Sequence, residues 1–260
     1  MNNKQVLKIV KIGGKLIEHE KKLSEFLLDF AKLSEPKILI HGGGNMATEI
    51  AGRLGYETHM VDGRRITDAN SIQVITMVYG GLISKNIVAK LQGLDCNAIG
   101  LCGADGKSIV SSKRPVKDID FGFVGDIENI NQKFITSLLE QGIIPVFSAI
   151  SYSDSGHLLN TNGDSVAAEI AKAMSENYSV ELYYCFEKKG VLTDIEDEKS
   201  LIEVLDSVKY DELKKQKLIH SGMLPKLHNC FSALEHGVEN ISLGDHELLK
   251  DGSLKTVIIK

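Results

Sequence analysis

The sequence predicts an α/β fold with a mainly parallel central sheet. Short apolar stretches of strand length alternate with helical patterns almost throughout the 260 residues. Two of the predicted strands end in glycine-rich turns that lead into helices. Hydrophobic residues make up 43% of the chain, which is enough for the core of one large domain or of two lobes.

The expected elements follow from apolar periodicity and from capping and turn residues. Strands are expected at residues 7–12, 37–40, 96–101, 143–150, 180–186 and 256–259. Helices are expected at 23–33, 68–91, 131–142, 164–174, 206–217 and 223–237. The polar stretch 175–179 is the best boundary, so we expect lobes at 1–176 and 177–260 that share one continuous sheet.

The region before the longest helix carries clear turn and capping signals. The dipeptide Asp62-Gly63 predicts a hairpin turn. Thr67 is expected to cap the helix, with Asp68 favourable in its first turn.

Composition excludes several classes of partner. The formal net charge is −5 with no long block of one sign, which argues against nucleic acid or an anionic membrane as the main partner. The four cysteines form no C-x-x-C pair, so we expect them to be reduced and mostly buried. Residues 1–11 contain no apolar signal region, and no apolar run approaches membrane-spanning length. We therefore expect a cytoplasmic protein.

Two glycine turns are the first candidates for chemistry. The first glycine turn reads K-I-G-G-K at residues 11–15, and the second reads H-G-G-G-N at residues 41–45. Glycine brings backbone N–H groups close to an anion, and the following helix N-terminus adds positive potential. Glycines in such turns can also serve packing alone, but the pair together indicates phosphate handling. Neither turn is a P-loop.

A dinucleotide site is a rival interpretation of the second glycine turn. Gly42, Gly44 and Ala47 match the spacing of the dinucleotide fingerprint, and Asp62 lies at about the right distance downstream. This would make the protein an NAD(P)-dependent oxidoreductase. Against it, Asp62-Gly63 is typical of a turn, and the match gives no role to the first glycine turn or to the downstream lysines.

Three further features are ambiguous on their own. Arg64 and Arg65 follow the predicted hairpin turn and could hold a carboxylate through paired hydrogen bonds, or could be solvated surface residues. The run N-T-N-G-D at residues 160–164 could cap a helix, but capping needs only one of its polar residues. Lys226, on an amphipathic helix after G-M-L-P, would by itself be assigned to a solvated face.

Taken together and in order, these segments resemble the amino acid kinase family over nearly the whole chain. The matching pieces are K-I-G-G-K, H-G-G-G-N, D-G-R-R-I-T, G-F-V-G-D at residues 122–126, N-T-N-G-D and G-M-L-P-K. The resemblance implies a three-layer αβα sandwich of the carbamate kinase-like type. The arginine hairpin and Asn160 favour the branch that acts on acylglutamates over those that act on aspartate, carbamate or UMP.

The resemblance also implies a reaction. The chain would use ATP and Mg²⁺ to phosphorylate the γ-carboxylate of an N-acyl-L-glutamate, acetyl or succinyl, in arginine biosynthesis. Residues 1–176 would form the acceptor lobe with a dimer helix, and 177–260 the nucleotide lobe. Another amino acid kinase activity, or a kinase-like sensor without turnover, stays open as an alternative. No general base is needed, because a carboxylate with a pKa of about 4.3 is already ionised at neutral pH.

Roles carry over residue by residue, and no protein side chain is expected as a metal ligand. Lys11 and Lys226 would stabilise the transferring phosphoryl group, and Asp164 would orient both lysines. The acceptor would be bound by Gly42, Gly43, Gly44, Arg65 and Asn160. The nucleotide would be bound by Gly13, Gly14, Lys189 and Gly190. The loop F-E-K-K-G at residues 186–190 departs from the family's Ser/Thr-Asp-Val-x-Gly pattern, which leaves the adenine contacts open.

The long helix suggests a homodimer. The helix has more apolar residues than it needs to pack one face against a sheet. They are Ile72, Ile75, Met77, Val78, Leu82 and Ile83. A symmetric partner is the simplest cover, and in the resembling family this helix forms the dimer interface. Only residues 1–5 precede the first strand, too few for the extra helix of arginine-sensitive members, so we expect no feedback inhibition by arginine.

Overall fold

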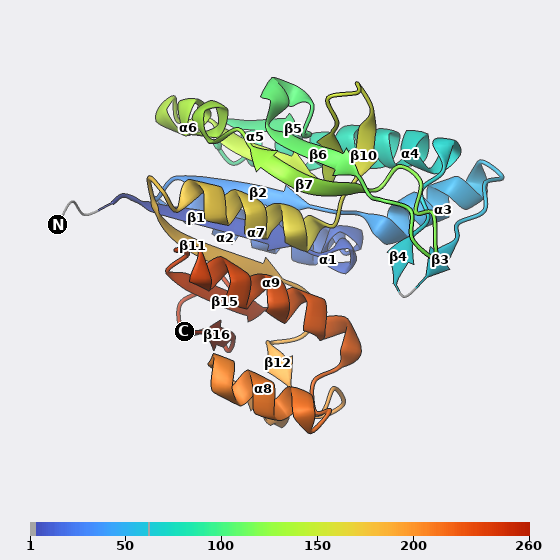
Figure 1. Cartoon of the computed structure of the whole chain (residues 1–260). Coiled ribbons are helices and arrows are strands. Elements are labelled where there is room, and N and C mark those ends of the chain that lie inside the picture. The colour runs from blue at the N-terminus through green and yellow to red at the C-terminus, as the bar shows by residue number, and fades with distance from the viewer. Residues whose placement is uncertain (1–3, 62) are drawn as a thin grey trace. The chain divides into compact units, whose positions relative to one another are not determined.

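The computed structural model describes residues 4–61 and 63–260. Its contacts divide the chain into two compact units, Met1–Lys37 with Ala167–Lys260, and Ile38–Val166. In Figure 1 the first unit is dark blue and yellow-brown to red, because it joins the two ends of the chain. This grouping differs from the expected lobes because strand β1 (Val6–Ile12) pairs along its whole length with a strand beyond residue 176. The functional division into acceptor and nucleotide lobes stays a prediction.

The first unit contains a mostly parallel sheet. Its strands lie in the order β14 (Val204–Leu205), β16 (Thr256–Ile258), β15 (Asn240–Gly244), β11 (Ser179–Cys185) and β1. The β1, β11 and β15 strands run parallel, with Ile12 beside Cys185 and Cys185 beside Gly244. The carboxyl ends of these three strands therefore meet at one edge, where open α/β sheets bind ligands.

The helices of the first unit are α1 (Gly14–Glu18), α2 (Glu20–Lys32), most of α7 (Gly163–Met174), α8 (Ser207–Lys215) and α9 (Leu224–Glu235). The unit also has 3₁₀ turns at Glu198–Ser200 and Ser221–Met223 and a hairpin of β12 (Val191–Leu192) with β13 (Leu201–Ile202). Helices α1, α2, α7 and α9 bury apolar side chains, whereas α8 has no buried residue. On α2 the buried residues are Leu23, Phe26, Leu27 and Phe30. The buried Lys37 ammonium donates to the carbonyls of Phe30, Ala31 and Leu33 at the end of α2, where the last carbonyls of a helix lack the N–H groups of a following turn.

The second unit contains two larger sheets and a hairpin. Parallel strands lie in the order β2 (Lys37–His41), β8 (Ile144–Ser148) and β5 (Ala98–Leu101). A separate sheet has the order β10 (Leu158–Asn160), β9 (Ile150–Tyr152), β6 (Ile109–Lys113) and β7 (Gly125–Ile130). The hairpin pairs β3 (Met60–Val61) with β4 (Arg64–Arg65), as predicted. Helices α3 (Gly44–Arg53) and α6 (Gln132–Glu140) and a 3₁₀ turn at Asp105–Lys107 complete the unit with the long helix.

The long helix differs from the prediction in two ways. It comprises α4 (Ala69–Ile75), a π-helical segment η1 (Thr76–Ile83) and α5 (Ser84–Gln92). Asp68, not Thr67, is its N-cap, and the Asp68 carboxylate accepts from the Ser71 N–H at 2.7 Å. By length and composition alone this helix could also cross a membrane, although 39% of its most apolar stretch is buried inside the protein.

The strand expected at 143–150 is two strands. It breaks at Ala149, whose N–H donates to the His41 carbonyl at 3.0 Å and whose carbonyl accepts from the Thr161 N–H at 3.1 Å. The chain thereby leaves the parallel sheet of β2 and β8 and enters the second sheet at β9. This crossing brings the N-T-N-G-D segment close to the end of β2.

Candidate functional site

The second glycine turn has a backbone conformation that only glycine tolerates well. Gly43 has φ of +152°, and a Cβ atom there would lie 2.1 Å from Ile83 Cδ1 and 3.2 Å from the Tyr79 ring. Both neighbours belong to the π-helical segment η1. Helix α3 begins directly after Gly43 without a side-chain cap. Among the described residues, the amides of Gly43 and Gly44 have no acceptor. The turn therefore presents backbone N–H groups as an anion site would.

Arg65 reaches this turn and Arg64 does not. One Arg65 nitrogen, Nη2, donates to the Gly44 carbonyl at 2.9 Å and to Thr48 Oγ1 at 2.7 Å. Its Nη1 donates to Thr58 Oγ1 at 3.1 Å. The Arg64 side chain, on the opposite face of the short hairpin, is exposed. A guanidinium next to unsatisfied amides provides two kinds of anion-binding group in one place.

Asn160 lies in a tight backbone cluster with the G-F-V-G-D segment. Its side-chain amide donates to Thr67 Oγ1 at 3.0 Å, and its backbone N–H donates to the Phe123 carbonyl at 2.8 Å. The Phe123 N–H in turn donates to the Thr67 carbonyl at 2.7 Å. Gly122 must be glycine here, because a Cβ atom would lie 2.2 Å from the Thr67 oxygen. The structure thus joins three matched segments that are far apart in sequence.

The last residue of that segment has a structural partner. Asp126 accepts from Arg114 through Nε at 3.1 Å and through Nη2 at 2.5 Å, in a paired geometry. This contact ties β7 to β6 across the second sheet.

Asn162 is the capping residue of the N-T-N-G-D run. Its side-chain oxygen accepts from the N–H groups of Asp164 at 2.8 Å and Ser165 at 3.1 Å. Asn160 and Asp164 are therefore not needed for capping, as the sequence suggested. Asp164 is half-buried in the first turn of α7. Its predicted role in orienting the two lysines stays a prediction.

Tyr79 and His41 are site residues that sequence reasoning missed. The Tyr79 side chain is 6% exposed and lies beside Gly43 and Gly44. Burial raises the pKa of Tyr79, and the Arg65 charge opposes that rise, which places the phenol near the guanidinium. No hydrogen bond of its hydroxyl is found among the described residues. His41 is fully buried behind the turn. Tyr79 has no sequence signal, because an apolar-faced helix often buries a tyrosine, whereas His41 opens the H-G-G-G-N motif but receives no role from it.

In the first unit, the first glycine turn is held by its neighbour strand. The Gly13 N–H donates to the Cys185 carbonyl at 3.0 Å. Gly14 begins the short helix α1. Lys15 in the same turn is exposed and forms an ion pair with Glu187 at 3.4 Å. One amide of this turn is therefore already used inside the protein.

Lys11 and Lys226 come together at the ends of β1 and β11. The Lys226 ammonium lies 4.9 Å from the centre of the Tyr184 ring and 5.7 Å from that of Phe186. Burial raises the pKa of the Cys185 thiol, Asp245 raises it further, and both lysines oppose the rise. Lys11 is paired with Tyr184 in the register of β1 and β11, and the Lys226 ammonium lies over the Tyr184 ring, so both lysines lie beside that residue. The structure thus brings together two lysines separated by more than two hundred residues in the sequence.

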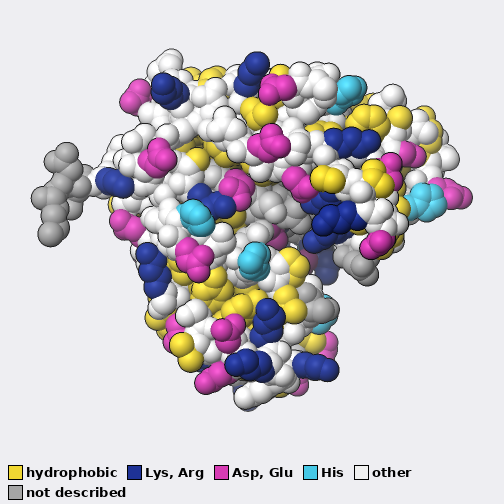
Figure 2. Space-filling view, viewed as in Figure 1, with side chains coloured by type: hydrophobic (Ala, Val, Ile, Leu, Met, Phe, Trp, Pro, Cys, Tyr) yellow, Lys and Arg dark blue, Asp and Glu magenta, His cyan; other side chains and the backbone are white. Residues whose placement is uncertain are grey.

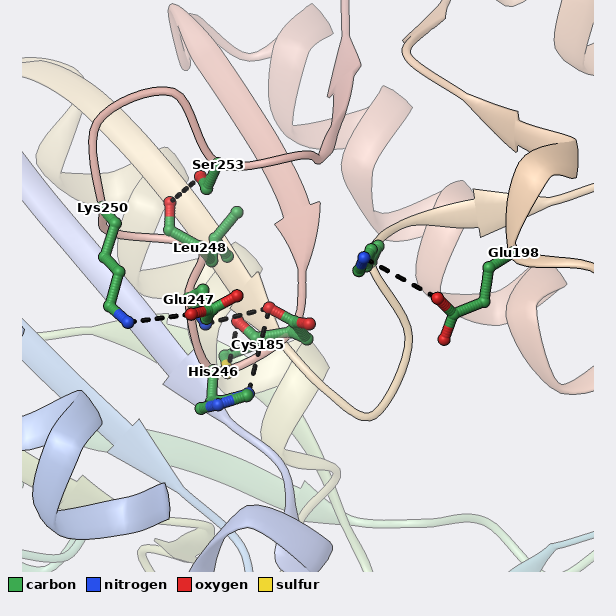
Figure 3. Close-up of polar contacts among 9 residues, drawn as sticks. Cys185, Glu198, His246, Glu247, Leu248, Lys250 and Ser253 are labelled. Atoms are coloured by element: carbon green, nitrogen blue, oxygen red, sulfur yellow. Dashed lines mark hydrogen bonds and ion pairs between the residues drawn. The ribbon is translucent and has the colours of Figure 1, made fainter. Parts of the chain in front are cut away.

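Lys189 and Gly190, the other predicted nucleotide contacts, also have structural partners. Lys189 forms an exposed ion pair with Glu198 at 3.7 Å. A Cβ atom on Gly190 would lie 2.8 Å from the Thr256 backbone nitrogen, so close packing alone requires glycine there. Figure 3 shows Glu198 together with the loop after β15, where the Cys185 thiol donates to the Asp245 carbonyl at 3.2 Å. Binding of nucleotide by these residues stays a prediction.

The rival dinucleotide site has little structural support. Asp62 lies outside the described residues, but the residues on either side of it form the antiparallel hairpin of β3 and β4. The dinucleotide fingerprint instead needs its acidic residue after a parallel strand. Within residues 4–61 and 63–260, no group of three or more histidine, cysteine, aspartate or glutamate side chains could hold a metal ion.

Curated relatives match the chain from end to end. A model of the amino acid kinase family matches residues 7–245. An acetylglutamate kinase from Phocaeicola vulgatus is 49% identical over 257 residues, covering 99% of this chain and 100% of that protein. One from Cytophaga hutchinsonii is 52% identical, covering 94% of this chain and 93% of that protein.

Solved structures share the fold. An N-acetylglutamate synthase from Neisseria gonorrhoeae has a TM-score of 0.83 at 21% identity, covering 99% of this chain and 60% of that one. A carbamate kinase from Giardia lamblia has a TM-score of 0.71 at 12% identity, covering 100% of this chain and 99% of that one. At these identities the likeness concerns the fold alone, and it confirms the fold class that the sequence predicted. With the family model and the nearly full-length relatives, it follows that the chain belongs to the amino acid kinase family.

Proposed function

We propose that this protein uses ATP to phosphorylate the γ-carboxylate of N-acetyl-L-glutamate, a step of arginine biosynthesis. The observation that carries the proposal is the position of Arg65, 2.9 Å from the Gly44 carbonyl and beside the unsatisfied amides of the second glycine turn. A substrate with two carboxylates needs two anion sites, and this region offers both. The names of the relatives that are 49% and 52% identical support the same substrate.

The chemistry needs positive charge rather than a base. The acceptor carboxylate is ionised at neutral pH, so the difficulty is to bring it against a polyanionic phosphate. In our proposal Arg65 binds the α-carboxylate, and the amides of Gly43 and Gly44 bind the acceptor carboxylate and the γ-phosphate. Asn160 holds the rest of the substrate.

The first unit supplies the nucleotide side in this proposal. Lys11 and Lys226 stabilise charge on the transferring phosphoryl group, and Asp164 orients them. Gly13, Gly14, Lys189 and Gly190 bind the nucleotide. Mg²⁺ enters with the phosphates of ATP, in the way that this ion is commonly held by substrate phosphates and few protein ligands. The acidic and basic side chains interspersed on the face in Figure 2 fit a small-molecule substrate better than nucleic acid.

A coupled assay of ADP release tests the proposal directly. The acceptors to compare are N-acetylglutamate, N-succinylglutamate, glutamate, aspartate, carbamate and UMP, each with ATP and Mg²⁺. We expect turnover with N-acylglutamates, and the ratio of kcat/KM between the acetyl and succinyl compounds identifies the acyl group. Turnover only with aspartate, carbamate or UMP would contradict the proposal. Tighter binding of NAD(H) than of ATP with Mg²⁺ would instead support the oxidoreductase.

We also propose a homodimer formed through the long helix. Met77 is 54% exposed and Leu82 is 45% exposed, although both are large and apolar. A cavity of about 520 Å³ opens beside Met77, and its lining residues are Ile72, Gln73, Thr76, Met77, Phe123, Gly156, His157 and Leu158. A second copy would cover this surface, and the other predicted apolar residues Ile75, Val78 and Ile83 are already buried. Light scattering tests the proposed dimer. We expect Met77→Glu to be monomeric, and a monomeric wild type would contradict the proposal.

A cytoplasmic location belongs to the same proposal. Cys96, Cys102 and Cys185 are free thiols, and Cys96 and Cys185 are buried. Free thiols are typical of a reducing compartment, which also supplies ATP.

A further inference from the structure

His41 is locked in place behind the second glycine turn. It is the last residue of β2, where it pairs with Ser148 on β8. Its carbonyl accepts from the Ala149 N–H at 3.0 Å, and its side chain has no exposed surface. The imidazole therefore lies on the protein side of the turn rather than in a space that a substrate could enter.

The hydrogen bond of this imidazole defines its tautomer. Its Nδ1 lies 2.9 Å from the Gly42 carbonyl oxygen. A carbonyl oxygen can only accept, so Nδ1 carries the proton and Nε2 keeps a lone pair. Burial lowers the pKa of His41 to about 4, so the ring is neutral at physiological pH.

The other nitrogen of the ring has no partner. Nε2 is buried and finds no hydrogen bond among the described residues. A buried acceptor without a donor destabilises the folded state, and an apolar side chain of similar shape would not. Stability alone would therefore favour a leucine or phenylalanine at this position. The bond from Nδ1 to Gly42 is what distinguishes histidine from them.

That bond acts on the peptide group between two glycines. A peptide flanked by glycines on both sides rotates more freely than any other, because neither residue has a Cβ atom to restrict it. At Gly42 an added Cβ atom would meet nothing within 4 Å, so no neighbour lies against that side of Gly42. A trans peptide is planar, with its C=O and N–H pointing in opposite directions. A donor on the Gly42 carbonyl therefore sets the direction of the Gly43 N–H.

We propose that His41 is a positioning residue for phosphoryl transfer, which holds the Gly42–Gly43 peptide so that the Gly43 N–H points away from the protein core and toward the reacting oxygens. This inference rests on the proposed function, because that function gives the Gly43 amide its role. His41 itself does not touch the substrate. It acts by preventing rotation of the amide, so that no binding energy is lost in orienting it during the reaction.

Three variants test whether activity requires the Nδ1 nitrogen of His41, the Nε2 nitrogen, or only the shape of the ring. In His41→Asn the amide nitrogen takes the place of Nδ1, whereas in His41→Gln it reaches the place of Nε2. His41→Leu removes both nitrogens. We expect His41→Asn to keep kcat within about threefold, and the other two to lose about ten- to a hundredfold with both KM values changed less than twofold. His41→Leu should unfold at the same temperature as the wild type or at a higher one.

Two results would overturn the inference. Full kcat in His41→Leu would mean that the ring only fills space. Retention by His41→Gln with loss in His41→Asn would mean that Nε2 is the functional nitrogen. If His41→Leu does not fold, the comparison of the other two variants still decides.

A measurement that does not depend on activity distinguishes failure of this inference from failure of the proposed function. Nitrogen NMR of histidine-labelled wild type should show a protonated Nδ1 and an unprotonated Nε2 for His41 at pH 7. The opposite tautomer would overturn the inference even in an active enzyme. A wild type that does not phosphorylate N-acetylglutamate would instead contradict the proposed function, and the Gly43 amide would then have no assigned ligand.

Discussion

The two glycine turns have nearly the same sequence signal and different physical roles. In the first glycine turn, the Gly13 amide donates to Cys185, and Gly13 has an ordinary extended conformation with φ of −78°. In the second, Gly43 has φ of +152° and the amides of Gly43 and Gly44 have no acceptor among the described residues. A glycine-rich turn after a strand therefore does not tell which amides remain available for an anion. The hydrogen bonds of the neighbouring strand decide that.

The largest effect is expected at Gly43. In Gly43→Ala the methyl group would overlap Ile83, and the backbone would be strained at its positive φ. Strain and overpacking each cost about 1–3 kcal/mol, and loss of an amide that stabilises the transition state costs about a hundred- to a thousandfold in kcat. Denaturant unfolding and steady-state kinetics measure both.

Two controls sharpen this result. Gly13→Ala would place its methyl group 3.4 Å from the Cys185 oxygen, a tolerable contact, and Gly42→Ala would meet nothing within 4 Å. Both should fold with nearly wild-type stability. Equal destabilisation of Gly13→Ala and Gly43→Ala would show that the two turns are more alike than their geometry indicates.

The next largest effect is expected at the two lysines of the first unit. Lys11→Ala and Lys226→Ala should each lower kcat by about a hundredfold, because each removes one charge from the transition state. Lys15→Ala is the matched control, since Lys15 lies in the same turn but forms an exposed ion pair with Glu187. It should change kcat by less than about twofold. Unchanged kcat in both main variants would remove the lysines from the mechanism.

A smaller effect is expected at Arg65, and it should fall on KM. Arg65→Lys keeps the charge but loses the paired donors that now bond Gly44, Thr48 and Thr58. The KM for N-acetylglutamate should rise about tenfold, while the KM for ATP stays nearly constant. Arg64→Lys should change neither, because Arg64 is exposed. The reverse pattern would mean that the hairpin presents the other arginine to the substrate.

The sequence predicts the order of elements well, because apolar periodicity and capping residues are local signals. It chooses Thr67 as the cap of the long helix where Asp68 is the cap, since both are good capping residues. The second sheet escapes prediction because β6 and β7 contain many polar residues and pair with each other rather than with the parallel sheet. The roles predicted for Lys226 and Asp164 come from the resemblance to the family, because no local pattern indicates them.

The environment of the second glycine turn was the hardest part to predict. A π-helical segment has the same composition as an α-helix, so nothing in residues 76–83 predicts which side chains it turns toward the glycines. The structure places Ile83 and Tyr79 there. A π-helical turn is wider than an α-helical turn, so it changes the face of the helix on which the later residues lie. π-helical segments are frequent at functional sites for that reason.

The smallest predicted effect tests whether that segment contributes to the acceptor site. The Tyr79 hydroxyl is almost buried, lies near Gly44 and Arg65, and has no hydrogen bond among the described residues. Tyr79→Phe should therefore leave the melting temperature of the free protein unchanged or raise it slightly, since no bond is lost. If the hydroxyl bonds the bound acceptor, the same substitution removes about 0.5–1.5 kcal/mol of binding free energy. The stabilisation of the protein by saturating N-acetylglutamate would then be smaller in Tyr79→Phe than in the wild type, with a KM raised several-fold.

Thermal unfolding with and without the acceptor measures this difference, and Tyr56→Phe serves as a control for a tyrosine that is exposed. An equal shift in both variants would mean that the π-helical segment supports the glycine turn by packing alone.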